Sequence, residues 1–307
     1  MKTALLFSGQ GSQYVGMLKD IYEKYPNAAE QINKSDEILG FSLSKICFEG
    51  PIDILKETRY TQPAIFMHSA VAFDLVKHNI EFSATAGHSV GEYAALYAAG
   101  VLSFEDALKL VAYRGKLMFE AGTQLPGTMF AVINLDDDKV DAVCNELNKN
   151  EDGKVVVAAN FNSPGQVVVS GSAQFLRDNV SAFKNAGARM VKELVVSGAF
   201  HSPLMEPAKL ELEKAINETN FNNAKVPVYS NVYAMPLTEA SAIKEALISQ
   251  LTSPVKWTQS LNNMKIDGFE KYIEIGPGNV LQGLTKRTIE NVEIFGIDKA
   301  EEIEKYI

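Results

Sequence analysis

Cysteine and long apolar runs are both scarce in this chain of 307 residues. The only two cysteines, Cys47 and Cys144, lie far apart and have none of the spacings of a zinc site or a disulfide framework, so we expect two reduced thiols. The apolar start ends at Gly9, which makes it too short for a signal peptide, and no other uncharged run is long enough to span a bilayer. We therefore predict a cytoplasmic protein without a membrane partner.

Positive charge is also in the minority. The chain has 29 Lys and Arg residues against 38 Asp and Glu residues, and the formal net charge is −9. The basic residues are scattered singly instead of forming the basic stripe that follows a phosphate backbone, so we expect no nucleic-acid partner. Apolar residues make up 46% of the chain, which is enough for a well-buried core. We expect a monomer.

The two ends of the chain have the alternation of strands and helices that is typical of an α/β fold. Residues 3–7 predict a buried strand before a glycine loop, and residues 82–100 predict a strand, a sharp turn and a helix. Ser103 resembles the N-cap of a helix that runs to about residue 120. Further segments complete the pattern: helices at 203–218 and 239–251, and a strand at 272–275.

The middle of the chain has a different order of predicted elements, βαββαβ. We expect strands at 129–133, 155–160, 166–170 and 189–196, and helices at 137–148 and 173–186. This order is the ferredoxin-like arrangement. The predicted fold class is therefore α/β, with a large α/β-hydrolase-like domain containing a parallel sheet (residues 1–126 and 198–307) and an inserted ferredoxin-like small domain (residues 127–197).

Ser89 is the first candidate for chemistry. It is the centre of Gly87-His88-Ser89-Val90-Gly91, which fits a nucleophile elbow, where a serine is held on a tight turn between a strand and a helix. In that context backbone N–H groups and the helix dipole can receive an oxyanion. The alternative is a chance Gly-x-Ser-x-Gly in a glycine-containing loop.

Arg114 stands out because it falls on the apolar stripe of its predicted helix. A buried guanidinium without a partner would cost several kcal/mol, so a carboxylate or phosphate is expected against it. That anion could be a ligand, but by itself the position is better explained by an internal Asp or Glu, or by a side chain that reaches solvent.

His201 precedes Ser202 and Pro203, which have the pattern of an N-cap and a first helical residue. An imidazole at the start of a helix suits a general base. A lone histidine is more often a capping or exposed residue, and only its conjunction with Ser89 favours the catalytic interpretation.

Several motifs in order make the chain resemble one family over nearly its whole length: the malonyl-CoA:acyl carrier protein transacylases, with the related acyltransferase domains of fatty acid and polyketide synthases. The motifs are Gly9-Gln10-Gly11-Ser12-Gln13, Thr61-Gln62-Pro63-Ala64, Gly87-His88-Ser89-Val90-Gly91-Glu92-Tyr93, Arg114, Asn160-Phe161-Asn162-Ser163-Pro164-Gly165-Gln166, Gly198-Ala199-Phe200-His201-Ser202, Pro254-Val255-Lys256-Trp257 and Glu274-Ile275-Gly276-Pro277-Gly278. One departure is Ser8, where many members have proline, and we expect it to change loop stiffness more than chemistry.

The resemblance implies a catalytic role for three residues. Ser89 would be acylated, His201 would take its proton, and the backbone carbonyl of Gln250 would orient the histidine. The N–H groups of Gln10 and Val90 would hold the oxyanion.

The resemblance also implies the substrate-binding residues. Arg114 would bind the malonyl carboxylate, and Phe200 would leave little room for an α-methyl branch. Asn160 and Gln62 would lie near the pocket, where each could equally hold the loop at the domain junction.

The implied reaction is the ping-pong transfer of malonyl from coenzyme A through a Ser89 ester to the phosphopantetheine thiol of an acyl carrier protein, in fatty acid biosynthesis. It needs no metal and no cofactor. Because carrier proteins are acidic, docking would use a local basic patch. Candidate residues for this patch are Lys184, Arg189, Lys192, Lys286 and Arg287.

Other functions stay open at this point. A free-standing acyltransferase of a polyketide synthase would share every motif. A serine hydrolase would share the elbow but has no evident use for Arg114. A dinucleotide-binding protein is suggested by Gly9 and Gly11 after the first strand, but the third glycine of that fingerprint is missing. A noncatalytic carrier-docking homologue would have no reason to keep Ser89, Arg114 and His201 together.

Overall fold

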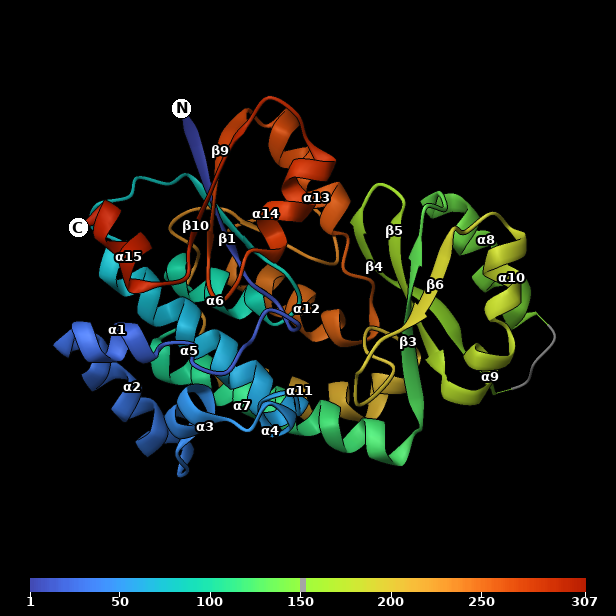
Figure 1. Ribbon diagram of the computed structural model, residues 1–307, viewed down its shortest axis with the longest axis horizontal. Helices are drawn as coiled ribbons and strands as arrows, with labels where there is room; N and C mark the ends of the chain where they lie inside the picture. Colours follow the sequence, from blue (N-terminus) through green and yellow to red (C-terminus); the bar gives the residue numbers. More distant parts are fainter. Residues whose placement is uncertain (150–152) are drawn as a thin grey trace.

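The computed structural model describes residues 1–149 and 153–307, and two separate sheets organise them (Figure 1). The first sheet has six strands, and all neighbouring pairs are parallel except the last. Its strands, in spatial order, are β10 (Glu293–Ile297), β9 (Phe269–Ile275), β1 (Lys2–Phe7), β2 (Ala84–Gly87), β7 (Val228–Tyr229) and β8 (Pro236–Leu237). The predicted parallel sheet is thus confirmed.

The second sheet is four-stranded and antiparallel throughout. Its spatial order is β4 (Val156–Ser163), β5 (Gln166–Ser172), β3 (Gly127–Ile133) and β6 (Met190–Glu193). Three helices accompany it: α8 (Asp137–Asn148), α9 (Ala173–Asp178) and α10 (Val180–Asn185). Along the chain the order is βαββαβ, with α9 and α10 together in the place of the second helix. The ferredoxin-like part of the predicted fold class is therefore also confirmed.

Helices cover both faces of the parallel sheet, because its strands are apolar on both sides. Along β1, Leu5 and Phe7 belong to one buried cluster, whereas Ala4 and Leu6 belong to another on the opposite face. The helices that contribute side chains to the first cluster include α5 (Thr58–Val76), α6 (Gly91–Ala98) and α7 (Phe104–Gln124), and those of the second are α13 (Trp257–Ile266) and α14 (Val280–Thr288).

The remaining helices lie around this core (Figure 1). They are α1 (Lys19–Lys24), α2 (Pro26–Leu39), α3 (Leu43–Glu49), α4 (Ile52–Leu55), α11 (Glu206–Glu218), α12 (Ala240–Ser249), α15 (Ala300–Ile303) and the 3₁₀ turns η1 (Pro203–Met205), η2 (Gln250–Thr252) and η3 (Glu304–Tyr306). None of the helices in the described part of the chain is long and apolar enough to cross a membrane. The two cysteines are buried and free.

Local expectations were met at some helix ends and missed at others. The Oγ of Ser103 accepts a hydrogen bond from the N–H of Asp106, so the predicted cap is confirmed, although the helix continues to Gln124. The single helix expected at 173–186 is wrong: it breaks at Asn179, whose side-chain amide donates to the carbonyl of Phe175 and so competes with the backbone ladder. The strand expected to reach residue 196 ends at Glu193.

Candidate active site

Ser89 lies on the tight turn between β2 and α6. Its φ of 52° is in the left-handed region, which few non-glycine residues adopt. The flanking glycines allow this turn: a Cβ at Gly87 would lie 2.0 Å from the carbonyl of Gly91, and a Cβ at Gly91 would lie 2.2 Å from the carbonyl oxygen of Phe7. The turn therefore has the geometry of a nucleophile elbow.

His201 lies against this serine, although 112 residues separate them in the chain. The hydroxyl of Ser89 is 2.8 Å from Nε2 of His201, and Nδ1 of His201 is 2.9 Å from the backbone carbonyl of Gln250. Because a carbonyl only accepts, Nδ1 carries the proton and Nε2 is left to accept from the serine. Ser202 caps the following 3₁₀ turn as predicted, and its Oγ accepts from the N–H of Leu204.

Burial keeps His201 neutral. It lowers the pKa of His201 to about 3, and the positive charge of Arg114 acts in the same direction. A neutral imidazole that is already hydrogen-bonded to a hydroxyl can accept its proton without first losing one of its own.

Arg114 is fully buried on α7, beside the same serine. Its Nη2 donates to the Oγ of Ser89 at 3.1 Å and to the side-chain oxygen of Gln250 at 2.9 Å, while Nη1 donates to the side-chain oxygen of Gln62 at 2.7 Å. Its Nε has no hydrogen-bond partner among the described residues. No described carboxylate is within ion-pair distance of it. The buried carboxylate of Glu92 acts on it from farther away and is linked to it through the side chain of Gln250.

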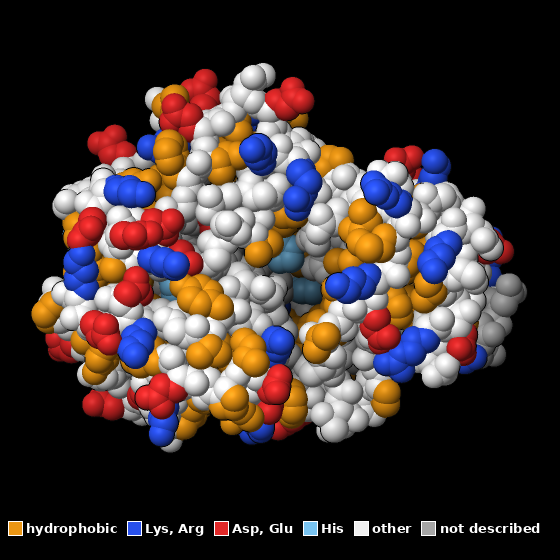
Figure 2. Space-filling view, in the orientation of Figure 1, with side chains coloured by type: hydrophobic (Ala, Val, Ile, Leu, Met, Phe, Trp, Pro, Cys, Tyr) orange, Lys and Arg blue, Asp and Glu red, His pale blue; other side chains and the backbone are white. Residues whose placement is uncertain are grey.

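A cavity of about 160 Å³ opens onto the serine and the histidine. It holds the volume of roughly five water molecules, which suits a small acyl group. The lining residues are Gln10, Gln62, His88, Ser89, Met118, Met129, Asn160, Asn162, Val168, Leu194, Val196, Phe200 and His201. Strands β3, β4 and β5 of the antiparallel sheet contribute to it, and so do the segments that follow β1 and β2 of the parallel sheet. Histidine side chains are visible at the bottom of a hollow between the two halves of the molecule (Figure 2).

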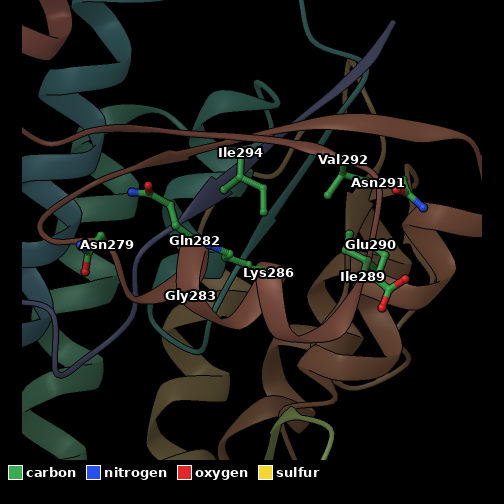
Figure 3. A pocket seen from close by; sticks show the side chains of 9 residues that line it. All are labelled: Asn279, Gln282, Gly283, Lys286, Ile289, Glu290, Asn291, Val292 and Ile294. Carbon is green, nitrogen blue, oxygen red and sulfur yellow. The ribbon is translucent and has the colours of Figure 1, made fainter.

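A larger cavity, of about 780 Å³, lies elsewhere, between α14 and β10 (Figure 3). It is lined mainly by amide, charged and aliphatic side chains such as Gln282, Lys286 and Ile294. None of its lining residues is a serine, histidine or cysteine, so it offers no nucleophile.

Of the four remaining predicted site residues, Gln10, Asn160 and Phe200 line this small cavity, and Val90 follows Ser89 in the chain. The side chain of Asn160 makes no hydrogen bond to another described residue, and Phe200 is buried next to His201. The backbone N–H groups of Gln10 and Val90 donate to no acceptor in the described parts of the chain. Both N–H groups are therefore available to a further acceptor.

Sequence analysis did not identify Asn231 as a site residue, yet it supports the serine turn from two sides. Its Oδ1 accepts from the N–H of Ser89 at 2.7 Å, and its Nδ2 donates to the carbonyl of Gly87 at 2.7 Å. Asn231 comes from the loop after the two-residue strand β7, and no local pattern marks it.

Glu92 is the second residue that was not singled out. It is buried, and its carboxylate accepts from the side-chain amide of Gln250 at 2.6 Å and from the N–H of Asn231 at 3.2 Å. Burial raises the pKa of Glu92 to about 7, against the opposing effect of these two hydrogen bonds and of the positive charge of Arg114. A signal did exist in the sequence: Glu92 is the only charged residue of the helix Gly91–Ala98.

His88 and Asn162 form a further contact across the cavity. Nε2 of His88 is 2.8 Å from Oδ1 of Asn162, which lies on β4 of the antiparallel sheet, and the imidazole packs edge-on against Trp257. This hydrogen bond ties the serine turn to the second sheet.

Comparisons with known proteins agree with this geometry. Residues 4–306 match the model of the acyl transferase domain family. The malonyl CoA-acyl carrier protein transacylase of Bacillus subtilis is 41% identical over 304 residues, which are 99% of this chain and 95% of the relative.

Solved structures are equally similar. An acyl carrier protein S-malonyltransferase from Vibrio cholerae is 40% identical, with a TM-score of 0.93 and 99% of each chain covered. A second solved structure contains a malonyl transacylase in complex with its type II PKS acyl-carrier protein. The transacylase is 36% identical to this chain, with a TM-score of 0.94, and the match covers 99% of this chain and 98% of that one. The chain therefore belongs to the acyltransferase family that includes the malonyl CoA-acyl carrier protein transacylases, as its motifs predicted.

Proposed function

We propose that this acyltransferase transfers malonyl from coenzyme A to the phosphopantetheine thiol of an acyl carrier protein through an ester on Ser89. The observation that carries the proposal is the burial of Arg114 without a direct ion pair to a described residue. A fully buried guanidinium that makes no direct ion pair with a described carboxylate contacts the nucleophile itself. A substrate whose acyl group ends in a carboxylate would supply the missing anion.

The first half-reaction forms the ester. The Oγ of Ser89 attacks the thioester carbonyl of malonyl-CoA while its proton passes to Nε2 of His201. The tetrahedral intermediate collapses, the C–S bond breaks, and the imidazolium returns the proton to the departing thiolate of coenzyme A.

The second half-reaction reverses these steps with a new thiol. His201 takes the proton of the carrier thiol, the thiolate attacks the Ser89 ester, and the proton returns to Oγ. The carbonyl of Gln250 keeps the imidazole in the tautomer that both steps need.

The N–H groups of Gln10 and Val90 would hold the oxyanion in both half-reactions. Each such donor typically contributes ~10²–10³ in rate. Their lack of any acceptor among the described residues supports this assignment.

Recognition of malonyl would require a small rearrangement. Gln62 and Gln250 already occupy donors of Arg114, so a carboxylate would bind Nε together with a donor that one glutamine releases. Phe200 would narrow the space at the α-carbon, which favours malonyl over methylmalonyl by ~10–200-fold. Asn160, with its free amide, would contact the thioester.

The division of the chain supports this scheme. We assign residues 1–126 and 198–307 to a catalytic domain and residues 127–197 to a small domain, with the cavity between their sheets. A cavity of about 160 Å³ fits the acyl group alone, so the long arm of either thioester would lie in the hollow outside it.

The acidic carrier protein would dock on basic side chains beside this hollow. Lys184, Arg189, Lys192 and Lys286 are exposed and form no ion pair with a described carboxylate. Arg287 donates to Gln166, at the turn of β4 and β5, and so links α14 to the antiparallel sheet. Charge reversal of Lys192 and Lys286 should raise the KM for the carrier without changing the KM for malonyl-CoA, and an unchanged carrier KM would refute this docking surface.

The reaction as written uses no metal or other cofactor, because exchange between thioesters is nearly neutral in energy. We place the enzyme in the cytoplasm, as a monomer, in fatty acid biosynthesis. Comparing transfer to a fatty acid carrier and a polyketide carrier would test the pathway, and a strong preference for the polyketide carrier would overturn that assignment.

Intact-mass spectrometry tests the proposal itself. After brief incubation with malonyl-CoA, the wild-type protein should gain one malonyl group, and Ser89→Ala should gain none. An adduct that persists in Ser89→Ala would move the nucleophile elsewhere. Release of free malonate without an adduct and without transfer to a carrier would indicate a hydrolase.

A further inference from the structure

The loop between Ser8 and Tyr14 carries Gln10, whose N–H group we assign to the oxyanion. It runs directly against the serine turn: a Cβ at Gly9 would lie 2.6 Å from the carbonyl oxygen of His88. Within the loop, the hydroxyl of Ser12 donates to the carbonyl of Gly9 at 2.6 Å. The position of the Gln10 amide therefore depends on how the two ends of this loop are fixed.

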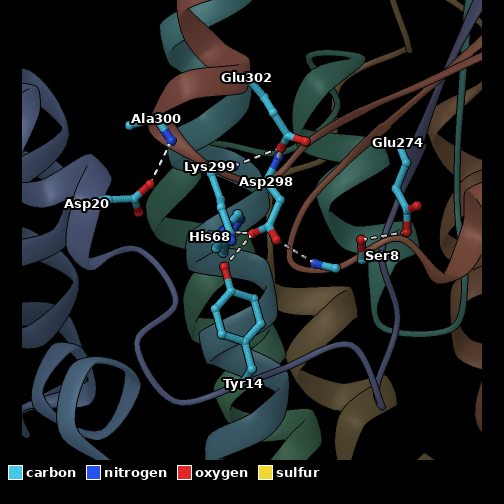
Figure 4. Close-up of polar contacts among 10 residues, drawn as sticks. Ser8, Tyr14, Asp20, His68, Glu274, Asp298, Lys299, Ala300 and Glu302 are labelled. Atoms are coloured by element: carbon cyan, nitrogen blue, oxygen red, sulfur yellow. Dashed lines mark hydrogen bonds and ion pairs between the residues drawn. The ribbon is translucent and has the colours of Figure 1, made fainter.

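A buried carboxylate fixes the first end. The hydroxyl of Ser8 donates to Oε1 of Glu274 at 3.0 Å, and both residues are almost completely inaccessible to solvent (Figure 4). Glu274 is itself held by the N–H groups of Leu281 and Gln282, each at 3.0 Å, at the start of α14. The loop after β9 packs on the same hydroxyl, since a Cβ at Gly276 would lie 2.6 Å from it.

A second carboxylate fixes the other end. The phenol of Tyr14 donates to Oδ1 of Asp298 at 2.8 Å, and the same oxygen lies 3.0 Å from Nε2 of the buried His68 (Figure 4). The other oxygen of Asp298 accepts from the N–H of Gly278 at 3.1 Å. Asp298 thus links the loop that follows β9 to the loop that carries Gln10, and Glu274 links the latter loop to the start of α14.

The backbone around Asp298 is anchored as well. Its own N–H donates to Glu302 at 2.7 Å, and the N–H of Ala300 donates to Asp20 at 2.8 Å (Figure 4). A carboxylate on an anchored backbone can hold a mobile partner in place. By contrast, the Gln10 side chain itself makes only a 3.3 Å contact with Thr58.

We propose that Glu274 and Asp298 form a carboxylate clamp that holds Ser8 and Tyr14 and thereby positions the N–H of Gln10 for the oxyanion. The inference rests on the proposed function, and it makes Ser8, Tyr14 and the two carboxylates positioning residues. None of them contacts the reacting atoms. Their effect is confined to the transition state, because the oxyanion forms only there.

The size of the effect follows from the role. Removal of a whole oxyanion donor costs ~10²–10³ in rate, and a displaced donor costs less than a deleted one. We expect each hydroxyl deletion in the clamp to lower the rate of acylation at saturating malonyl-CoA by roughly tenfold. The concentration of malonyl-CoA at half-saturation should change by less than about twofold, since the ground state has no oxyanion.

The test compares Ser8→Ala and Tyr14→Phe with Tyr229→Phe in rapid-quench measurements of Ser89 acylation. Tyr229→Phe is the matched control, because Tyr229 also donates its phenol to a carboxylate, Asp267, outside the loop and the cavity. Melting temperatures of all three variants measure any general loss of stability. Tyr14→Phe keeps its ring, so it remains informative if Ser8→Ala is poorly folded.

The clamp predicts a fall in the saturating rate for Ser8→Ala and Tyr14→Phe, unchanged half-saturation, and a rate for Tyr229→Phe equal to wild type. Saturating rates that match Tyr229→Phe would overturn it, as would a rise in half-saturation with an unchanged rate. The proposed function fails separately, if the wild-type protein forms no malonyl adduct at all.

Discussion

Replacing Arg114 by alanine should turn the enzyme from malonyl transfer toward acetyl transfer. Arg114 is fully buried, and its guanidinium lies 3.1 Å from the nucleophile. Malonyl-CoA and acetyl-CoA differ by the carboxylate that we assign to this guanidinium. Arg114→Ala therefore removes the partner of the malonyl carboxylate, whereas acetyl-CoA has no group at that position to lose a partner.

The magnitude can be worked from the hydrogen bonds. A carboxylate held by two N–H donors of a buried guanidinium would lose two charge-assisted hydrogen bonds, each worth about 1.5–3 kcal/mol. Since the glutamines that now bind Arg114 must release a donor, we take the lower part of that sum, about 3–5 kcal/mol. The kcat/KM for malonyl-CoA should fall by roughly 10²–10⁴-fold.

The assay follows Ser89 acylation by both thioesters in wild type, Arg114→Ala and Arg114→Lys. Acetyl-CoA is the internal control, because loss of the Arg114 contact to the Ser89 hydroxyl affects both substrates equally. Arg114→Lys keeps the charge without the planar fork and should recover only part of the malonyl rate. Equal losses with malonyl-CoA and acetyl-CoA would refute the assignment and would leave Arg114 as a support of the serine alone.

Three other predictions concern folding, protonation and positioning. Gly91→Ala places a Cβ 2.2 Å from the backbone of β1 and should destabilise the protein by about 3 kcal/mol or more. Gly283→Ala is the control, because its Cβ would have no atom nearer than 3.8 Å, and it should not destabilise the protein. Chemical denaturation of both variants checks this. The pKa of His201 is lowered to about 3, so this side chain stays neutral in the folded protein but takes up a proton below about pH 6.5 in the unfolded chain. The stability that it contributes is therefore lost as the pH falls. Between pH 6.5 and 5 the free energy of unfolding of wild type should fall by about 2 kcal/mol more than that of His201→Asn. Asn231→Ala frees the N–H of Ser89 and should lower kcat roughly 10–100-fold with little change in KM, and a change confined to KM would contradict that role.

Much of the site could be predicted from sequence because its signals are local. The elbow around Ser89 requires small neighbours within two residues, and the cap at Ser202 follows directly after His201. Arg114 was found from the periodicity of a single helix. In each case a single element contains both the residue and the local feature that marks it.

The rest depends on tertiary contacts that no local pattern encodes. Asn231 follows a strand of two residues and meets Ser89 142 positions away. The hydrogen bond from Ser8 to Glu274 spans 266 positions, and neither segment indicates the other. The break at Asn179 was missed because the helical propensity of residues 173–186 hides a side chain that bonds its own backbone.

The most direct test of the account is a chase of the isolated malonyl-enzyme. We predict that holo acyl carrier protein removes the malonyl group from Ser89 within one turnover and becomes malonylated, and that the apo carrier, which lacks the thiol, removes none. Loss of the adduct to water at the same rate with either carrier, with free malonate as the product, would contradict the account.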